Sequence, residues 1–161
     1  MDNINSAKIV VTGAIAWVSA KMGILYPILI TLVAMAITDY LTGCSASVID
    51  GKKLSSKEGL KGILKKLGYF VAVAVGVCID WLIVNVSAQI GIDIQVKALF
   101  GILISVWLIL NELLSIVENL NRMDIRLPSF LKKTITLLIG KVEQQGDITG
   151  TENETKEKAE V

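Results

Sequence analysis

Four acidic residues lie within or beside long apolar runs, and they are the side chains best placed for chemistry: Asp39, Asp80, Glu112 and Glu118. A carboxylate inside hydrocarbon costs about 2.5–3.5 kcal/mol on insertion scales, so such residues usually face other helices or water. For the deeper Asp80 and Glu112, bonding between helices and lining of a water-filled path are both open. Asp39 and Glu118 stand at the ends of their runs, which favours pairing with lysine or arginine. For Glu118 the expected partner is Arg122, at the next turn, or a lysine of the first loop.

Other polar side chains follow the same spacing in residues 98–119, which would form a helix of roughly 33 Å. Ser105, Glu112 and Asn119 recur every seven residues, while Asn111, Ser115 and Glu118 share one helix face. Polar side chains on one face of a membrane helix need hydrogen-bond partners on another helix or in water. The candidates for pore lining or helix association are therefore Asp39, Asp80, Ser105, Asn111, Glu112, Ser115, Glu118 and Asn119.

Enzymatic chemistry is poorly supported. An intramembrane aspartyl protease needs two aspartates at one depth, whereas Asp39 lies near a helix end and Asp80 near mid-membrane. The chain has no histidine, and Cys44 and Cys78 form no CxxC motif, which favours buried free thiols over a metal site or a disulfide. We expect a protein that is not an enzyme and has no cofactor, no metal and no nucleic-acid partner.

The composition indicates an integral membrane protein, because 53% of the 161 residues are hydrophobic and the mean hydropathy is +0.63. Three runs are long enough to span a bilayer, at about 22–43, 67–90 and 98–119. An N-terminal segment, 1–21, contains a shorter apolar stretch, 9–20, that suits an interfacial helix. One long kinked helix over residues 9–43 is the alternative, and a removable signal peptide is not expected.

Two basic segments flank the spans. The loop 44–66 has the spacing of a capping box at Ser55 and Glu58, which predicts a short helix either on an anionic leaflet or in solvent. Residues 120–142 predict a second basic amphipathic helix, and the acidic tail 143–161 is expected to be disordered. The lysines expected at the membrane surface are Lys52, Lys53, Lys57, Lys61, Lys65, Lys66, Lys132 and Lys133.

Small residues at Gly68, Ala72 and Gly76 repeat every four positions, a pattern that allows close helix packing. The two basic segments are separated by two spans, so the positive-inside rule predicts an outer N-terminus and a cytoplasmic C-terminus. The predicted fold is thus an all-α integral membrane protein, with three transmembrane helices plus amphipathic interfacial helices, that assembles as an oligomer.

Several phrases, in this order and spacing, resemble the phage-lysis and toxin-secretion holin family. The resemblance covers about residues 34–140 and rests on DYLTG at 39–43, GKKLSS at 51–56 with Gly59 and Gly62, Asp80, NELLS at 111–115 with Glu118-Asn119, and Leu127-Pro128. The chain departs from the pattern at Met123-Asp124, where glycine would be expected second. Since glycine favours a left-handed helix stop, the exit of the third span is open at this point.

The resemblance implies a holin: a homo-oligomer in the bacterial cytoplasmic membrane that opens lesions at a set time. Through these lesions a cell-wall endolysin, or in some relatives a toxin, would leave the cytoplasm. Polar stripes on apolar helices fit this function, because association would lower the desolvation cost of the polar groups. A small ion or solute channel, a transporter subunit using the same acids, and a structural membrane scaffold remain the competing classes.

Overall fold

The computed structural model describes residues 2–52, 55–91 and 98–157, and the described chain is helical almost throughout. In chain order the helices are α1 (Asp2–Met22), α2 (Leu25–Ile49), α3 (Ser56–Gln89), α4 (Leu99–Arg122) and α5 (Ser129–Glu157). Three segments within them are long and apolar enough to cross a membrane: Leu25–Ile49, Gly59–Gln89 and Leu99–Arg122. The prediction of three spanning helices is confirmed at this level, with bounds that differ by several residues.

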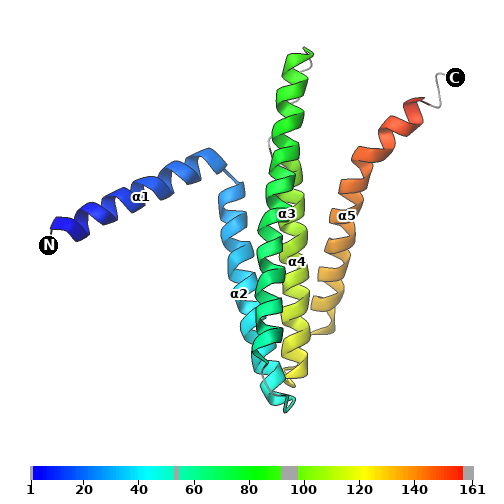
Figure 1. The fold of residues 1–161 in the computed structure, drawn as a ribbon. Coiled ribbons are helices and arrows are strands. Elements are labelled where there is room, and N and C mark those ends of the chain that lie inside the picture. The colour runs from blue at the N-terminus through cyan, green and yellow to red at the C-terminus, as the bar shows by residue number, and fades with distance from the viewer. Residues whose placement is uncertain (1, 53–54, 92–97, 158–161) are drawn as a thin grey trace.

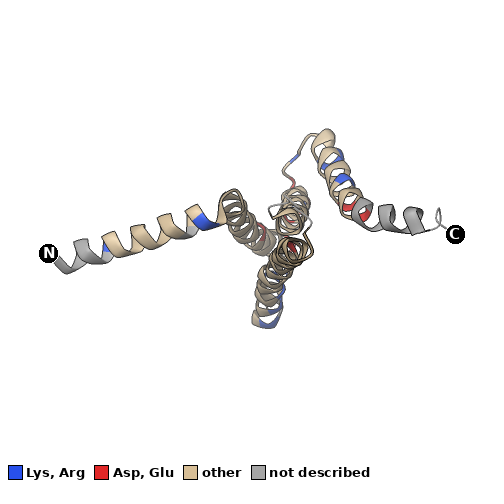
Figure 2. Cartoon of the chain, turned by 90° about the horizontal axis from the view of Figure 1, so that it is seen from above, with Lys and Arg blue, Asp and Glu red and all other residues tan. Residues whose placement is uncertain are grey.

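Helix α4 is the centre of the bundle, since α2, α3 and α5 all pack against it. Helices α2 and α4 run in one direction and α3 runs in the other, while α5 returns alongside α4 (Figure 1). We call the end of the bundle at which α2 ends, α3 begins and α4 ends the basic end. Seen from above, α1 and α5 extend away from the three-helix core on different sides (Figure 2).

The N-terminal helix is separate from the first span. Helix α1 ends at Met22, and Gly23 adopts a left-handed backbone with φ of 53° before α2 begins at Leu25. Glycine takes this conformation without the steric cost that a side chain would bring. The structure therefore differs from the alternative of a single long helix over 9–43, and α1 points away from the bundle (Figure 1).

Helix α3 is longer than the sequence suggested. The backbone at Ser55 is extended and the helix begins at Ser56, as the capping pattern predicted, although the Ser55 side chain makes no cap hydrogen bond. The helix then continues through Lys66 without a break, so the expected surface helix and the second span are one element. Its leucines and lysines are good helix formers, and no proline interrupts the join. Residues 92–97 of the predicted turn lie outside the described part of the chain.

Apolar packing holds the middle of the bundle. One residue from each spanning helix forms the buried centre, Leu32 of α2, Val73 of α3 and Leu108 of α4, and Tyr69 and Ile104 pack against it. Many other large apolar side chains point outward instead, as they do in a protein surrounded by lipid. The polar residues that are also buried, among those described, are Asp80, Ser87, Ser105 and Glu112.

A close approach of α3 and α4 depends on two glycines. A Cβ atom on Gly76 would lie 2.8 Å from Ile104 Cδ1 and 3.0 Å from the Phe100 carbonyl oxygen, and one on Gly101 would lie 2.9 Å from Val77 Cγ2. Of the predicted small-residue ladder, Gly76 lies in this contact, whereas Gly68 has nothing within 4 Å. Ala72 between them is partly buried.

Adding one methyl group at these glycines separates their roles. We expect Gly76→Ala to destabilise the bundle by about 1–3 kcal/mol, because backbone atoms of α4 must shift to admit it. Gly68→Ala should be neutral or slightly stabilising, since alanine is the better helix former by about 1 kcal/mol. Unfolding in mixed micelles, followed by circular dichroism, measures both. Equal stability of the two variants would contradict the close contact.

Helix α5 lies along α4 rather than ending near residue 142. Lys132 Nζ is 2.9 Å from Glu118 Oε1, Ile135 is buried, and Trp107 Nε1 donates a 2.9 Å hydrogen bond to Glu143 Oε1. The helix runs on to Glu157, through most of the segment for which the sequence predicted a disordered acidic tail. Glutamate, glutamine and lysine are good helix formers, which permits this extension. Residues 158–161 lie outside the described chain.

The exit of α4 has the left-handed stop that glycine usually supplies. Asp124, the residue at which the chain departs from the family pattern, has φ of 58°. The Ile125 amide donates to the Leu120 carbonyl oxygen at 3.1 Å, and the Asp124 amide donates to that of Asn121 at 3.2 Å. These bonds satisfy the last carbonyls of the helix. Aspartate tolerates this conformation better than most residues, so the helix ends here without glycine.

Candidate functional site

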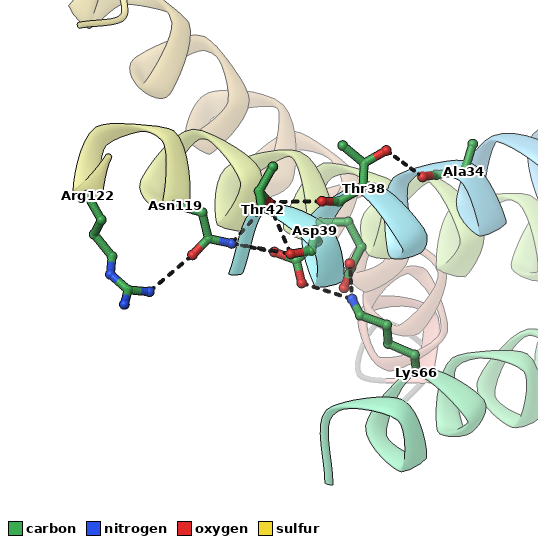
Figure 3. A network of polar contacts seen from close by, with 8 residues as sticks. Ala34, Thr38, Asp39, Thr42, Lys66, Asn119 and Arg122 are labelled. Atoms are coloured by element: carbon green, nitrogen blue, oxygen red, sulfur yellow. Dashed lines mark hydrogen bonds and ion pairs between the residues drawn. The ribbon is translucent and has the colours of Figure 1, made fainter. Parts of the chain in front are cut away.

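Three charged side chains from the three spanning helices meet inside the bundle. Lys66 Nζ of α3 lies 2.9 Å from Asp39 Oδ2 of α2 and also bonds Glu112 Oε2 of α4. Glu112 is only 2% exposed, and the side chain of Lys66 is 16% exposed. Figure 3 shows Lys66 reaching toward the carboxylates from its own helix. We call Asp39, Lys66 and Glu112 the charged triad.

The triad has one ammonium group for two carboxylates, so ionised it has a net charge of −1. The Tyr69 ring centroid is 5.7 Å from Lys66 Nζ, which places an aromatic face beside the ammonium group of the triad. Every buried side-chain nitrogen and oxygen atom among the described residues has a hydrogen-bond partner. The closed bundle therefore satisfies its polar interior by itself.

A chain of polar contacts leads from the triad to the basic end. Asn119 Nδ2 donates to Asp39 Oδ1 at 3.0 Å and to Thr42 Oγ1 at 3.3 Å, and its own Oδ1 accepts from Arg122 Nη1 at 3.3 Å (Figure 3). Arg122 Nη2 is 2.6 Å from Asp50 Oδ2. Together with the triad, these contacts form what we call the polar seam, a connected path along α4.

The outer contact of the seam also affects ionisation. The hydrogen bond from Arg122 lowers the pKa of the Asp50 carboxyl, and the positive charges of Arg122 and Lys52 act in the same direction. Asp50 follows the last residue of α2, outside the spanning segment. Its carboxylate and Arg122 therefore form an ion pair between the ends of α2 and α4 at neutral pH.

A groove of about 840 Å³ opens beside the seam at the basic end, between α2, α3 and α4. Its charged lining residues are Asp39, Lys52, Lys66, Glu118 and Arg122, and Ser115 and Asn119 also line it. Asp39 and Lys66 belong to the triad. One turn beyond Lys66 along α3, Tyr69 packs on the apolar centre of the bundle, where Leu32, Val73 and Leu108 meet.

The two loop glycines of the family resemblance have a packing role in this groove. A Cβ atom on Gly59 would lie 3.1 Å from Tyr40 Oη, and one on Gly62 would lie 4.0 Å from the Tyr40 ring. Tyr40 of α2 thus covers the glycine face of α3. This contact could not be inferred from the sequence, because the two helices are joined by a loop that leaves their relative rotation free.

Asp80 has a different task at the opposite end of the bundle. Its Oδ1 accepts a 2.9 Å hydrogen bond from the Phe100 amide, and its Oδ2 accepts a 2.8 Å bond from the Gly101 amide. Asp80 is 7% exposed, and Ala98 enters α4 with a left-handed φ of 62°. A carboxylate at this position satisfies free amides and complements the positive end of the helix dipole. Asp80 is thus an N-terminal cap supplied by another helix.

The two aspartates considered for a protease are far apart. Lys66, which bonds Asp39, precedes Asp80 on α3 by a length of helix that rises roughly 21 Å. One proton cannot be shared across that separation. Among the described residues, no three histidine, cysteine, aspartate or glutamate side chains are grouped so as to hold a metal ion.

The remaining polar candidates bond within or beside α4. Ser105 is fully buried and donates to the Gly101 carbonyl oxygen at 2.7 Å, and Asn111 donates to that of Trp107 at 2.8 Å. Ser115 lines the groove. Glu118 pairs with Lys132 of α5, not with Arg122 or a lysine of the first loop as the sequence suggested. Of the seven-residue stripe, Glu112 and Asn119 thus bond to other helices, and Ser105 bonds within α4.

The basic residues also divide into groups. Lys66 was placed at the membrane surface by sequence, but in the structure it is partly buried in the triad, because it lies on the side of α3 that faces α4. Lys52 lies 3.9 Å from Asp50, and Lys57, Lys61, Lys65, Lys132 and Lys133 are exposed. Lys53 lies outside the described residues.

Comparison with known proteins identifies relatives over most of the chain. An uncharacterised protein of Halalkalibacterium halodurans is 37% identical over 131 residues, which cover 81% of this chain and 90% of the relative. An uncharacterised protein of Listeria monocytogenes is 34% identical over 110 residues, covering 68% and 70%. A 14.9 kDa protein of Clostridium perfringens, described by its position 3′ of nagH, is 36% identical over 116 residues, covering 70% and 77%.

No solved structure was found to match the chain. The model of the bacteriophage holin family, however, matches residues 16–139, which include all three spanning helices and the first turns of α5. The matched region contains every residue of the polar seam and the Asp80 cap. By this match and by its three apolar helices, the chain is a multi-pass membrane protein and belongs to the bacteriophage holin family.

Proposed function

We propose that this protein is a holin that oligomerises in the bacterial cytoplasmic membrane and opens lesions at a timed point of host lysis. A cell-wall endolysin, or in some relatives a toxin, would pass through them. The observation that carries the proposal is the polar seam inside lipid-exposed helices. It stores charged groups within the closed bundle, where they satisfy one another.

Opening requires these groups to change partners. Three spans of one chain cannot enclose a hole wide enough for a folded protein, so many copies must contribute to its wall. If α2 separates from α3, Asp39 loses Lys66, and if α3 separates from α4, Glu112 loses it. Each carboxylate then needs water or a second copy of the chain as its partner. A water-filled wall built from α4 of many copies provides this. The transition is then collective, because each open copy hydrates the polar face of its neighbours.

Charge distribution supports an orientation with the C-terminus of α4 in the cytoplasm. Lys52, before α3, and Arg122, at the end of α4, both line the groove at the basic end of the bundle. Positive charge beside spanning helices favours the cytoplasmic side. With three spans, residues before α2 would then lie outside. Accessibility of single cysteines, placed at either end of the bundle in a variant without Cys44 and Cys78, tests this orientation from both sides.

The central test is lysis of bacteria that produce the chain with or without a cytoplasmic endolysin. We expect an abrupt fall in culture density only with the endolysin, together with loss of membrane potential at the same time. A slow ion leak without passage of the endolysin would instead identify a small channel. That outcome would give the groove beside Asp39 and Lys66 the function of a channel vestibule.

Within the same assay, the two glutamates of α4 should behave differently. Glu112→Gln removes one charge from a buried triad, so we expect a clear shift in the onset of lysis. Glu118→Gln removes an exposed pair with Lys132, which is worth about 1 kcal/mol at most. Its lysis curve should remain close to that of the parent at equal protein level. Matching curves for the two variants would contradict the function assigned to the seam.

A further inference from the structure

The first turns of α3 have a row of lysines that the seam does not use. Lys57, Lys61 and Lys65 follow one another at intervals of four and are all exposed. Residues at this spacing lie on one side of a helix. Among the side chains that the structure describes, none of the three forms an ion pair, whereas the next lysine, Lys66, has two carboxylate partners. One acid, Glu58, lies in the same stretch, so the three lysines and this glutamate have a net charge of +2.

An apolar stripe runs beside this row. Leu64, Leu67 and Val71 are each more than half exposed and do not line the groove. They share the outward side of α3, since Lys66 and Val73 face the bundle interior. A basic row beside an exposed apolar stripe is the pattern of a helix at the boundary between headgroups and acyl chains. Lysine stems can lie on the apolar stripe while the ammonium groups reach outward.

Positive charge inside the groove is already compensated. Arg122 is bound by Asp50 at 2.6 Å, and Lys66 is bound by Asp39 and Glu112. Glu118 and Asp39 also line the groove. An anion in the groove therefore meets cations that carboxylates already hold, whereas in the lysine row three lysines stand against one acid, Glu58. Charge complementarity favours the outer face of α3 for anion binding.

We propose that the Lys57–Lys61–Lys65 face binds the phosphate groups of anionic phospholipids in the leaflet at the basic end of the bundle. The negative surface potential of that leaflet attracts juxtamembrane lysines, and Leu64, Leu67 and Val71 contact the acyl chains below. This fixes the depth of α3 in the membrane, because the basic row stays at phosphate level. The inference concerns lipid contact alone and does not depend on lesion opening.

The test uses the purified full chain reconstituted in phosphatidylcholine vesicles that contain spin-labelled phosphatidylglycerol or spin-labelled phosphatidylcholine. Electron paramagnetic resonance gives the fraction of each lipid at the protein surface and hence the selectivity. The parent chain should favour phosphatidylglycerol. The triple variant Lys57→Gln, Lys61→Gln, Lys65→Gln should lower this selectivity at least fivefold, on the order of the effect of one lysine near an anionic surface.

The matched control is Arg126→Gln, Lys133→Gln, Lys141→Gln, which removes the same net charge from exposed positions between α4 and the middle of α5. It should keep the parent's selectivity, and helicity by circular dichroism should be equal in all three proteins. An equal loss in both triple variants would overturn the proposal in favour of a general charge effect. A parent without lipid preference, or a triple variant that instead loses self-association in pure phosphatidylcholine, would also overturn it.

Discussion

Lys66→Met should destabilise the closed bundle by about 3–5 kcal/mol, because it leaves Asp39 and Glu112 without their shared counter-charge. Methionine keeps most of the length and apolar volume of the lysine stem, so lost packing contributes little. Unfolding in mixed micelles measures the stability, and onset of lysis at equal protein level measures the function. We expect lower stability and an earlier onset.

Two further variants make this result specific. Lys65→Met alters the neighbouring, exposed lysine and should change stability by no more than about 0.5 kcal/mol. Combining Lys66→Met with Asp39→Asn and Glu112→Gln removes all three charges together and should recover most of the loss, since neutral polar groups cost less to bury. Equal stability of Lys66→Met and Lys65→Met, or no recovery in the triple variant, would show that the triad does not hold the three helices together.

Asp80→Ala should release the start of α4. The carboxylate bonds the Phe100 and Gly101 amides, and a buried donor left without an acceptor costs about 1–3 kcal/mol. Loss of an N-terminal cap alone costs about 1 kcal/mol. We therefore expect a loss of about 2–4 kcal/mol in stability and faster hydrogen exchange at these two amides, measured by mass spectrometry.

The graded variants for this site are Asp80→Asn and Asn85→Ala. Asparagine retains one acceptor oxygen but no charge, so its effect should lie between that of the parent and of alanine. Asn85 is exposed on the same helix and bonds only the Trp81 carbonyl oxygen among the described residues, so its removal should leave exchange at Phe100 and Gly101 unchanged. Unchanged exchange in Asp80→Ala would mean that α4 begins without this cap.

The seam and the cap give the two deep carboxylates separate functions. Glu112 is held by the lysine side chain of Lys66, which also binds Asp39. Asp80 is bound to backbone amides, which remain in place as long as α4 stays helical. In the proposed opening, Asp80 holds α3 and α4 as a pair, so α2 is the helix that separates. Asp39 of α2 then loses Lys66, whereas Glu112 of α4 keeps it.

The spans were predictable because hydropathy is a local property. A run of about twenty apolar residues must be helical in lipid, whatever surrounds it, since its backbone groups have no other partners. The sequence also predicted that the acids would need partners and that Gly68, Ala72 and Gly76 would form a close-packing ladder. Of the two glycines, Gly76 lies in a close contact and Gly68 does not. The helix start after Ser55 was also visible, because the pattern of a capping box depends on immediate neighbours.

The partners themselves were decided by tertiary structure. Each residue turns a helix by about 100°, so the rotation and offset of two helices determine which side chains meet. The sequence alone placed Lys66 at the surface and paired Glu118 with Arg122 or a lysine of the first loop. Helix packing instead encloses most of the Lys66 side chain between the spans and pairs Glu118 with Lys132. Local hydropathy thus determined that the chain has three membrane-spanning helices and that these helices contain acidic residues. Their long-range register determined that Asp80 caps a helix while Glu112 shares one lysine with Asp39.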